Sequence, residues 1–202
     1  HEDYDKDLIS IEELREIFQL CVSYVLRRAV CDISTSSLNK TFATMKNDIK
    51  PEDYLNSVKA FFIVLNSYKE FPNDERFLAT FRIRDIYNMN RCRYILGRLE
   101  NWDNKSVVSL DNLTIEHIIP QNSQLSSEWI ATLGDNWSEV QKEYLHTIGN
   151  LTMTAYNSEM SDYSFGEKLD MVGGFRQSAL RLNNYVVMQS TWGEQQVNER
   201  AK

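Results

Sequence analysis

The sequence has few residues that could cross-link it covalently or through zinc. Its three cysteines, Cys21, Cys31 and Cys92, are scattered, and no Cys-x-x-Cys pair occurs. Structural zinc sites and disulfide frameworks use closely spaced or paired cysteines. The spacing therefore excludes a cysteine-rich zinc site and predicts three small buried side chains in a reducing compartment, the cytoplasm.

Long apolar runs and glycine-rich loops are missing as well. No segment approaches the roughly 20 apolar residues that span a bilayer, so we expect no membrane partner. The first residues are acidic and polar, unlike a signal peptide, and the absence of an initiator Met suggests a fragment of a longer protein. With seven glycines and no G-x-x-x-x-G-K motif, a nucleotide-binding phosphate loop is excluded and no cofactor-binding residues are expected.

The charge balance is acidic, with 22 Lys and Arg against 29 Asp and Glu. Because phosphate binding is mainly electrostatic, this balance argues against a protein that coats nucleic acid non-specifically. Arginines nevertheless concentrate between residues 76 and 98, where Asp85 is the one acid. This segment is either a solvated face with ion pairs or a strip that faces DNA, with Arg91 and Arg93 as candidate contacts.

Residues 1–105 are predicted to form a mostly helical bundle. Ser10-Ile11-Glu12-Glu13 has the pattern of a helix-capping box, and apolar residues then recur at helical spacing as far as Val25. Further helices are expected over residues 37–45, from Pro51, after Asn73 and over residues 90–100. The apolar and aromatic stripes of these helices are expected to form a core.

Residues 106–202 have a different pattern and are predicted to form a second, α+β domain. Strands are expected over residues 107–110, 113–117 and 151–154. The second of these stops before Pro120, since proline cannot continue a strand ladder. Short helices are expected over residues 129–133 and 137–145, from Ala155 and after Thr191.

Glu116 and His117 stand next to each other at the end of the strand expected over residues 113–117. Neighbouring residues of a strand point to opposite faces, so these two can share a site only if the strand ends or bends there. The nearby Pro120 makes such a bend plausible. An imidazole with an ordinary pKa of about 6.5 suits a general base at neutral pH.

A second polar segment follows over residues 147–158, with the sequence TIGNLTMTAYNS. A carboxylate and an amide oxygen are hard ligands suited to Mg²⁺. A second amide can hold an imidazole in the tautomer that leaves one ring nitrogen free. One carboxylate, one base, one orienting amide and one ligand amide are the parts that single-metal phosphodiester hydrolysis requires.

In the order of its motifs the chain resembles the C-terminal part of the GmrSD-type restriction endonucleases, modification-dependent (type IV) enzymes that cut modified phage DNA. The stretches IEHIIPQ, GNLTMTAYNS and SFGEK stand here in the family's order. Arg27-Arg28, Phe71-Pro72-Asn73-Asp74 and residues 94–100 extend the resemblance into the helical half. It implies an HNH-like ββα-metal nuclease domain with accessory helices, and a nucleotide-dependent N-terminal domain or subunit outside this sequence.

The resemblance also implies a role for each motif residue. His117 would be the general base and Glu116 a metal ligand. Asn150 would orient the base, and Asn157 would be the second metal ligand in place of the final histidine of the HNH pattern. The implied cofactor is Mg²⁺ or Mn²⁺, and the implied substrate is DNA, with modified phage DNA cut in antiviral defence.

Three further polar residues belong to the same segments. Gln121 and Lys168 match the family's pattern, and we expect them to contact phosphate. His146 competes for a catalytic role, although a surface or supporting position is the more common outcome for such a residue. Many HNH proteins have zinc-binding cysteines around the ββα unit, and here the tryptophan-rich helices must supply that rigidity.

Two other classes of function remain open. The chain would be a catalytically inactive, nuclease-like scaffold or nucleic-acid-binding module if Glu116, His117 and Asn157 made only strand-end and helix-cap hydrogen bonds. A different hydrolase built on a His–Glu pair is disfavoured, since neither a Gly-x-Ser-x-Gly elbow nor a His-Glu-x-x-His helix occurs.

Overall fold

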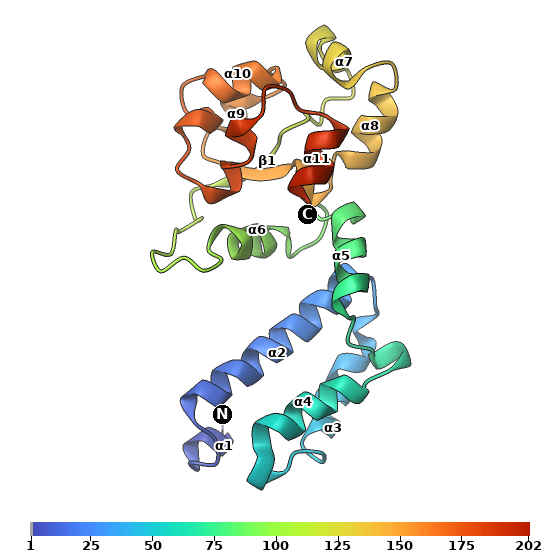
Figure 1. Ribbon diagram of the computed structural model, residues 1–202, viewed down its shortest axis with the longest axis vertical. Helices are drawn as coiled ribbons and strands as arrows, with labels where there is room; N and C mark the ends of the chain where they lie inside the picture. Colours follow the sequence, from blue (N-terminus) through green and yellow to red (C-terminus); the bar gives the residue numbers. More distant parts are fainter. Residues whose placement is uncertain (1) are drawn as a thin grey trace. The chain divides into compact units, whose positions relative to one another are not determined.

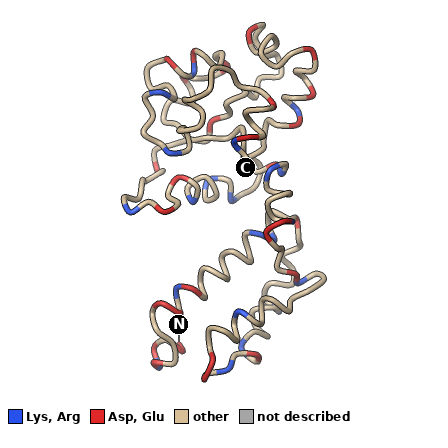
Figure 2. The backbone as a smooth tube through the Cα atoms, viewed as in Figure 1, with Lys and Arg blue, Asp and Glu red and all other residues tan. Residues whose placement is uncertain are grey.

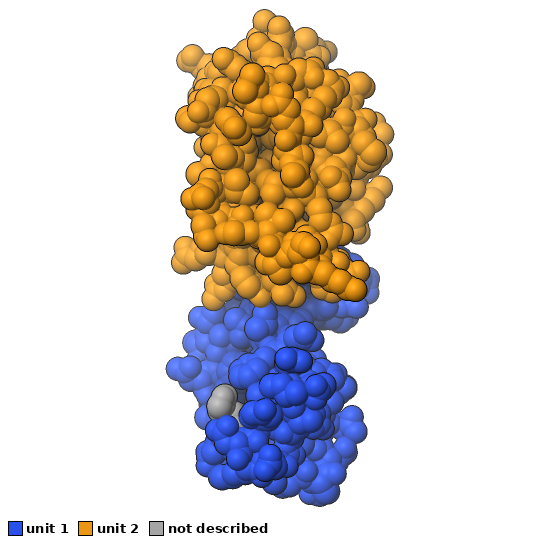
Figure 3. Space-filling view, turned by 90° about the vertical axis from the view of Figure 1, so that its left-hand side faces the viewer, with its two compact units in different colours: residues 1–80 blue, residues 81–202 orange. Residues whose placement is uncertain are grey.

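A computed structural model describes residues 2–202 of the chain. The chain divides into two compact units, His1–Thr80 and Phe81–Lys202, which Figure 3 distinguishes by colour. No helix within the described part of the chain is long and apolar enough to cross a membrane.

The boundary between these units differs from the one that the sequence predicts, between residues 105 and 106. Helix α6, Cys92–Glu100, lies in the second unit. Its last residue, Glu100, is fully buried there, and its carboxylate accepts hydrogen bonds from the backbone N–H groups of Arg181 (3.0 Å) and Leu182 (2.9 Å). The periodicity of a helix shows which of its faces is buried but not which partner covers that face, so the sequence pattern alone does not show which unit a helix joins.

The first unit is helical (Figure 1). Its helices are α1 Glu2–Asp5, α2 Ile11–Val30, α3 Leu38–Met45, α4 Tyr54–Val64 and the start of α5 Asp74–Ile83, with short 3₁₀ turns at Thr35–Ser37, Pro51–Asp53 and Ser67–Lys69. The predicted capping box is confirmed, because the Glu13 N–H donates to Oγ of Ser10 (3.2 Å) and the Ser10 N–H donates to the Glu13 carboxylate (2.8 Å).

An aromatic cluster forms the core of this unit. The fully buried ring of Tyr24 contacts the rings of Phe42, Phe62 and Phe71. The neighbouring Arg28 is buried too, and its guanidinium donates to the Ser34 carbonyl oxygen (2.6 Å) and to Oγ of Ser37 (3.0 Å). Arg28 therefore joins α2 to the turn that follows it.

The second unit combines helices with one small sheet, which confirms the α+β class. After α6 come β1 Thr114–His117, α7 Ser127–Leu133, α8 Trp137–Tyr144, β2 Leu151–Thr154, α9 Asn157–Met160, α10 Phe165–Asp170 and α11 Glu194–Arg200, with 3₁₀ turns at Ile148–Asn150, Phe175–Gln177, Arg181–Asn183 and Val186–Met188. Strands β1 and β2 pair antiparallel, with Glu116 opposite Thr152 and His117 opposite Leu151.

The strand predicted over residues 107–110 does not form, so this prediction is wrong. The side chain of Asn101 satisfies the backbone hydrogen-bonding groups of Val108 instead. Its Oδ1 accepts from the Val108 N–H (2.7 Å), and its Nδ2 donates to the Val108 carbonyl (3.1 Å). Val107 is 76% exposed. A short β-like stretch therefore lacks a neighbouring strand with which to pair here.

Two tryptophans stand in the core of the second unit, which has no zinc-binding cysteines. Trp129 and Trp192 are fully buried. Their indole N–H groups donate to the Tyr163 carbonyl (2.9 Å) and to Oδ1 of Asn150 (3.3 Å), respectively. Trp192 thus connects the core directly to one of the predicted site residues.

Helix α11 holds the segment that precedes β2. The guanidinium of Arg200 donates to the carbonyl oxygens of Ile148 (3.2 Å), Gly149 (2.8 Å) and Leu151 (2.8 Å). A Cβ atom on Gly149 would lie 2.2 Å from the Val197 carbonyl oxygen, so only glycine allows this approach. The Gly-Asn pair of the second motif is therefore the place where α11 meets the sheet.

Candidate functional site

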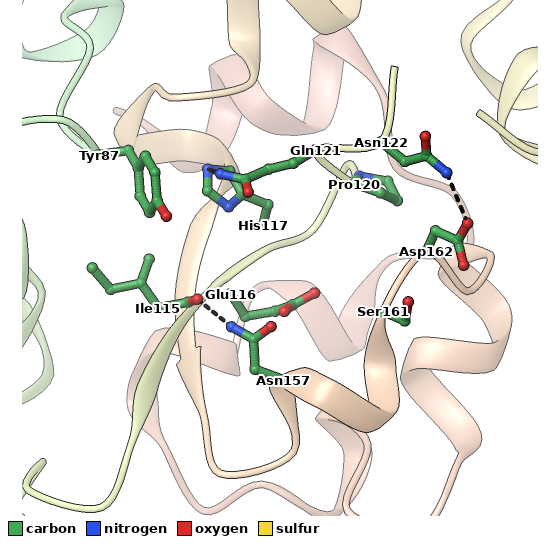
Figure 4. Close-up of a pocket in the computed structure, with 10 residues that line it drawn as sticks. All are labelled: Tyr87, Ile115, Glu116, His117, Pro120, Gln121, Asn122, Asn157, Ser161 and Asp162. Atoms are coloured by element: carbon green, nitrogen blue, oxygen red, sulfur yellow. Dashed lines mark hydrogen bonds between the residues drawn. The ribbon is translucent and has the colours of Figure 1, made fainter. Parts of the chain in front are cut away.

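A cavity of about 350 Å³ opens beside the end of β1 (Figure 4). Its walls are Tyr87, Ile115, Glu116, His117, Pro120, Gln121, Asn122, Asn157, Ser161 and Asp162. Four of the predicted site residues, Glu116, His117, Gln121 and Asn157, are among them. Residues that stand far apart in the sequence therefore share one cavity.

Glu116 and His117 both line this cavity although they are neighbours in a strand. The strand ends at His117, and the next backbone N–H, of Ile118, donates to the Asn150 carbonyl (3.0 Å) as the chain turns toward Pro120. Glu116 is 3% exposed and His117 is 6% exposed. The bend that the sequence required for a shared site is present.

The His117 ring is held by three neighbours. Its Nε2 lies 3.1 Å from Nδ1 of His146 and 3.2 Å from Nε2 of Gln121. The ring of Tyr87 packs edge-on at a centroid distance of 4.4 Å. The ring lies at the wall of the cavity (Figure 4).

The imidazole of His117 is neutral over the physiological pH range. Burial, followed by repulsion from His146 in its protonated form and from the Lys168 ammonium, lowers the pKa of His117 to about 3, against a smaller opposing effect of Asp85. A neutral imidazole has one nitrogen that can accept a proton. A negatively charged phosphate in the cavity would raise this pKa toward the range of an effective base.

Glu116 forms an ion pair with Lys168, for which the sequence predicts a contact with phosphate. Nζ of Lys168 lies 2.5 Å from Oε1 of Glu116 and 2.9 Å from the His117 carbonyl oxygen, and the lysine is fully buried. Burial raises the pKa of Glu116 and lowers that of Lys168, and their mutual attraction opposes both shifts. The Lys168 ammonium is enclosed between these two partners, and a phosphate contact by Lys168 stays a prediction.

The SFGEK motif explains how a lysine reaches this position. The backbone N–H and Oγ of Ser164 both donate to the Glu167 carboxylate (2.8 Å each), which fixes the start of α10. Phe165 joins the core, and Lys168 lies one turn further along the helix. The motif therefore delivers a buried cation to Glu116.

Asn157 is the first residue of α9 and presents its amide oxygen to the cavity. Its Nδ2 donates to the Ile115 carbonyl of β1, so the amide orientation is fixed by the sheet. Oδ1 then faces the same space as the Glu116 carboxylate (Figure 4). Glu116 and Asn157 together offer two hard oxygen donors.

The side-chain oxygens of Glu116 and Asn157 could take part in holding a magnesium ion. Among residues 2–202, no group of three or more His, Cys, Asp or Glu side chains is arranged to hold a metal ion. Mg²⁺ usually keeps several of its waters and takes one or two carboxylates or carbonyls from the protein. The Glu116 carboxylate and the Asn157 amide oxygen agree with this number and type of protein ligands.

Asn150 does not contact the imidazole, unlike the orienting amide that the sequence predicts. It is fully buried, and its Oδ1 accepts from the Ile119 N–H (2.8 Å) while its Nδ2 donates to the Ile119 carbonyl (3.2 Å) and the Leu145 carbonyl (3.0 Å). Asn150 therefore fixes the backbone immediately after His117. It is a positioning residue that acts through the chain rather than through the ring.

The two predicted arginine contacts have different surroundings. Arg91 precedes α6, and its side chain is exposed. Arg93 donates to the carbonyl oxygens of Leu110 and Leu113, which ties α6 to the segment before β1. Figure 2 shows Lys and Arg along this helix. A DNA contact by Arg91, by Gln121 or by both stays a prediction, and Arg93 has a structural task.

Tyr87 is a site residue that the sequence did not indicate, whereas the sequence indicated His146 only as a competitor for a catalytic role. Tyr87 comes from the loop between α5 and α6, and its ring stacks on that of His146 at 5.0 Å and 13°. The carbonyl of His146 accepts from the N–H groups of Ile86 (2.9 Å) and Tyr87 (3.2 Å). The position of His146 just before the second motif was the one available signal.

A buried carboxylate, a neutral imidazole and an amide oxygen around one polar cavity define a candidate hydrolytic site. A family model described as "GmrSD restriction endonucleases, C-terminal domain" matches residues 71–202, which is well over half of the chain. The chain therefore belongs to this family of restriction endonucleases. No curated protein and no solved structure matches it.

Proposed function

We propose that the chain is a metal-dependent DNA endonuclease of the HNH-like, ββα-metal type that hydrolyses phosphodiester bonds. The observation that carries this proposal is the shared cavity of Glu116, His117 and Asn157 in a member of a restriction endonuclease family. The order β1, β2, α9 supports it, since the first strand carries the acid and the base and the helix begins with the amide ligand.

In the proposed reaction, His117 acts as the general base. Nδ1 of His117 removes a proton from a water molecule, whose oxygen forms a bond to phosphorus while the bond from phosphorus to the 3′ oxygen breaks. Mg²⁺ or Mn²⁺, held by Glu116 and Asn157, would supply positive charge next to the phosphate. Lys168 fixes the Glu116 carboxylate through Oε1, which leaves Oε2 for the ligand role.

The first experiment is plasmid cleavage by the full chain with Mg²⁺ or Mn²⁺, comparing wild type with His117→Ala. Loss of the base should reduce cleavage by about 100-fold or more, with folding and DNA binding retained. Glu159→Gln is the matched control, because this exposed acid lies close to the site in α9 without lining the cavity. Normal cleavage by His117→Ala would overturn the mechanism.

We further propose modified phage DNA as the substrate, which follows from the family and not from any contact in the cavity. Plain and glucosylated phage DNA are to be compared in the same assay. Preferential cutting of the glucosylated DNA supports this part of the proposal. Equal cutting of both overturns the preference and leaves the nuclease in place.

Metal binding separates the nuclease from an inactive scaffold. Calorimetric titration of the wild-type chain with Mn²⁺ should show binding that Asn157→Ala weakens, because this variant removes one oxygen donor and leaves the Glu116–Lys168 pair intact. A wild-type chain that binds no Mn²⁺ and cuts no DNA would contradict the proposed function and favour the scaffold.

A further inference from the structure

His146 makes the one contact between two imidazoles in the part of the chain that the structure describes. Its Nδ1 lies 3.1 Å from Nε2 of His117, and the two rings meet edge-on with centroids 5.2 Å apart. Between two neutral imidazoles, one nitrogen must carry the proton and the other must accept it. The direction of this hydrogen bond decides which nitrogen of His117 is free.

The surroundings hold His146 in place on its other sides. The ring of Tyr87 stacks on the His146 ring, and the His146 carbonyl accepts two backbone hydrogen bonds from Ile86 and Tyr87. A side chain restrained by both its ring and its backbone has a defined orientation. The approach of Nδ1 to His117 is therefore built into the fold.

Asp85 lies on the loop that carries Tyr87 and interacts electrostatically with His146. Burial acts to raise the pKa of the Asp85 carboxyl, but the hydrogen bonds from Asn88, with smaller contributions of His146 in its protonated form and of Arg84, outweigh burial, so the pKa is lowered. The carboxylate is held by the Asn88 N–H (3.0 Å) and Nδ2 (2.7 Å). Asp85 is therefore a fixed negative charge in the electrostatic surroundings of His146.

We propose that His146 is a positioning residue that sets the tautomer of His117. Nδ1 of His146 accepts the Nε2–H of His117, so that Nδ1 of His117 keeps its lone pair toward the cavity. The exposed amide of Gln121 turns its oxygen toward the same Nε2–H, as either end of an amide can occupy that position. The inference rests on the proposed function, because a free Nδ1 matters only if His117 is a base.

The opposite direction of the hydrogen bond would remove the base. If His146 donated its proton to Nε2 of His117, the proton of the His117 ring would sit on Nδ1, and that nitrogen could not accept one from water. The same two side chains therefore support or prevent catalysis according to one proton.

Nitrogen NMR of the full chain, without DNA or metal, tests the tautomer independently of cleavage. The sequence has three histidines, so the ring signals can be assigned from His146→Phe and His117→Gln. In wild type, His117 should carry its proton on Nε2, and His146→Phe should weaken that preference. A proton on Nδ1 of His117 in wild type would overturn the inference whether or not the chain cuts DNA.

Cleavage kinetics test the consequence with a matched pair of variants. His146→Phe keeps a ring that can stack on Tyr87 but lacks an acceptor, and it should lower kcat by about tenfold or more with little change in KM. In His146→Asn, the amide oxygen stands near the place of Nδ1, and most of the lost kcat should return. Equal loss in both variants, or a loss confined to KM, would contradict a positioning role.

The two experiments also separate the inference from the proposed function. If the NMR tautomer is as expected and the wild-type chain cuts no DNA, the nuclease proposal fails while the His146 contact stands. If the chain cuts DNA and His117 carries its proton on Nδ1, the nuclease proposal is supported and the positioning role of His146 is contradicted.

Discussion

The ammonium of Lys168 lies 2.5 Å from Oε1 of Glu116, with both side chains almost completely shielded from solvent. The same ammonium donates to the His117 carbonyl at 2.9 Å. One buried cation thus binds both the Glu116 carboxylate and the His117 backbone. Because each charge lost its water on folding, the two are stable in this position only as a pair.

We therefore expect the free energy of unfolding of Lys168→Met to be about 3–5 kcal/mol lower than that of wild type. The variant leaves the Glu116 carboxylate buried without its counter-ion. The double variant Lys168→Met with Glu116→Gln removes both charges and should recover part of this loss. Urea unfolding of the three chains measures the differences. A single variant as stable as the double would contradict an ionised, coupled pair.

The low pKa of His117 makes the fold sensitive to acid. The imidazole titrates at about 3 in the folded chain and at about 6.5 when unfolded. Between these values the unfolded state binds more protons, so stability falls as the pH drops below about 6.5, until the folded pKa is reached.

His117→Gln removes this proton-linked loss of stability. Acidification from neutral pH to about pH 5 lowers the free energy of unfolding of wild type. The corresponding decrease in the variant should be smaller by about 2 kcal/mol. Urea unfolding at a series of pH values measures the effect. Parallel pH profiles of the two chains would show that His117 titrates in the folded state as it does in the unfolded chain.

Arg91 and Arg93 provide a matched test of DNA contact. Arg91 is exposed, whereas Arg93 is hydrogen-bonded to the backbone before β1. Arg91→Glu should weaken DNA binding and lower the slope of its salt dependence by about one, with an unchanged melting temperature. Arg93→Glu should lower the melting temperature. If Arg91→Glu binds DNA like wild type at low salt, Arg91 is not part of the interface.

Gly149 and Gly166 test the contact between the second motif and α11. A Cβ on Gly149 would meet the Val197 carbonyl oxygen at 2.2 Å, while one on Gly166 would meet nothing within 4 Å. Gly149→Ala should cost about 1–3 kcal/mol, since backbone must move to relieve the clash. Gly166→Ala should be neutral or stabilising, because alanine favours a helix. Equal melting temperatures for the two variants would argue against a close packing of α11.

Much of the local structure was predictable because it depends on neighbours in the chain. Ser10 and Glu13 form their capping box by contacts three residues apart, and the helices of both units follow the apolar periodicity. The strand over 107–110 failed for the opposite reason. The β-like composition was present, but the hydrogen-bonding groups of the Val108 backbone are satisfied by the side chain of Asn101 rather than by a second strand.

The residues of the candidate site were also predictable, and their contacts were not. The motif order placed Glu116, His117 and Asn157 together, and they line one cavity. The burial of Lys168, the indirect role of Asn150 and the entry of Tyr87 all depend on how distant segments pack. No spacing along the chain encodes those distances.

By itself, the sequence determined the helix starts, the pairing segments and the chemical types that gather at the end of β1, since each depends on short-range pattern or motif. The tertiary structure decided that Lys168 faces Glu116 and that His146 faces His117. The physical reason is burial. A side chain removed from water must find its partner across the fold, and that partner is set by packing.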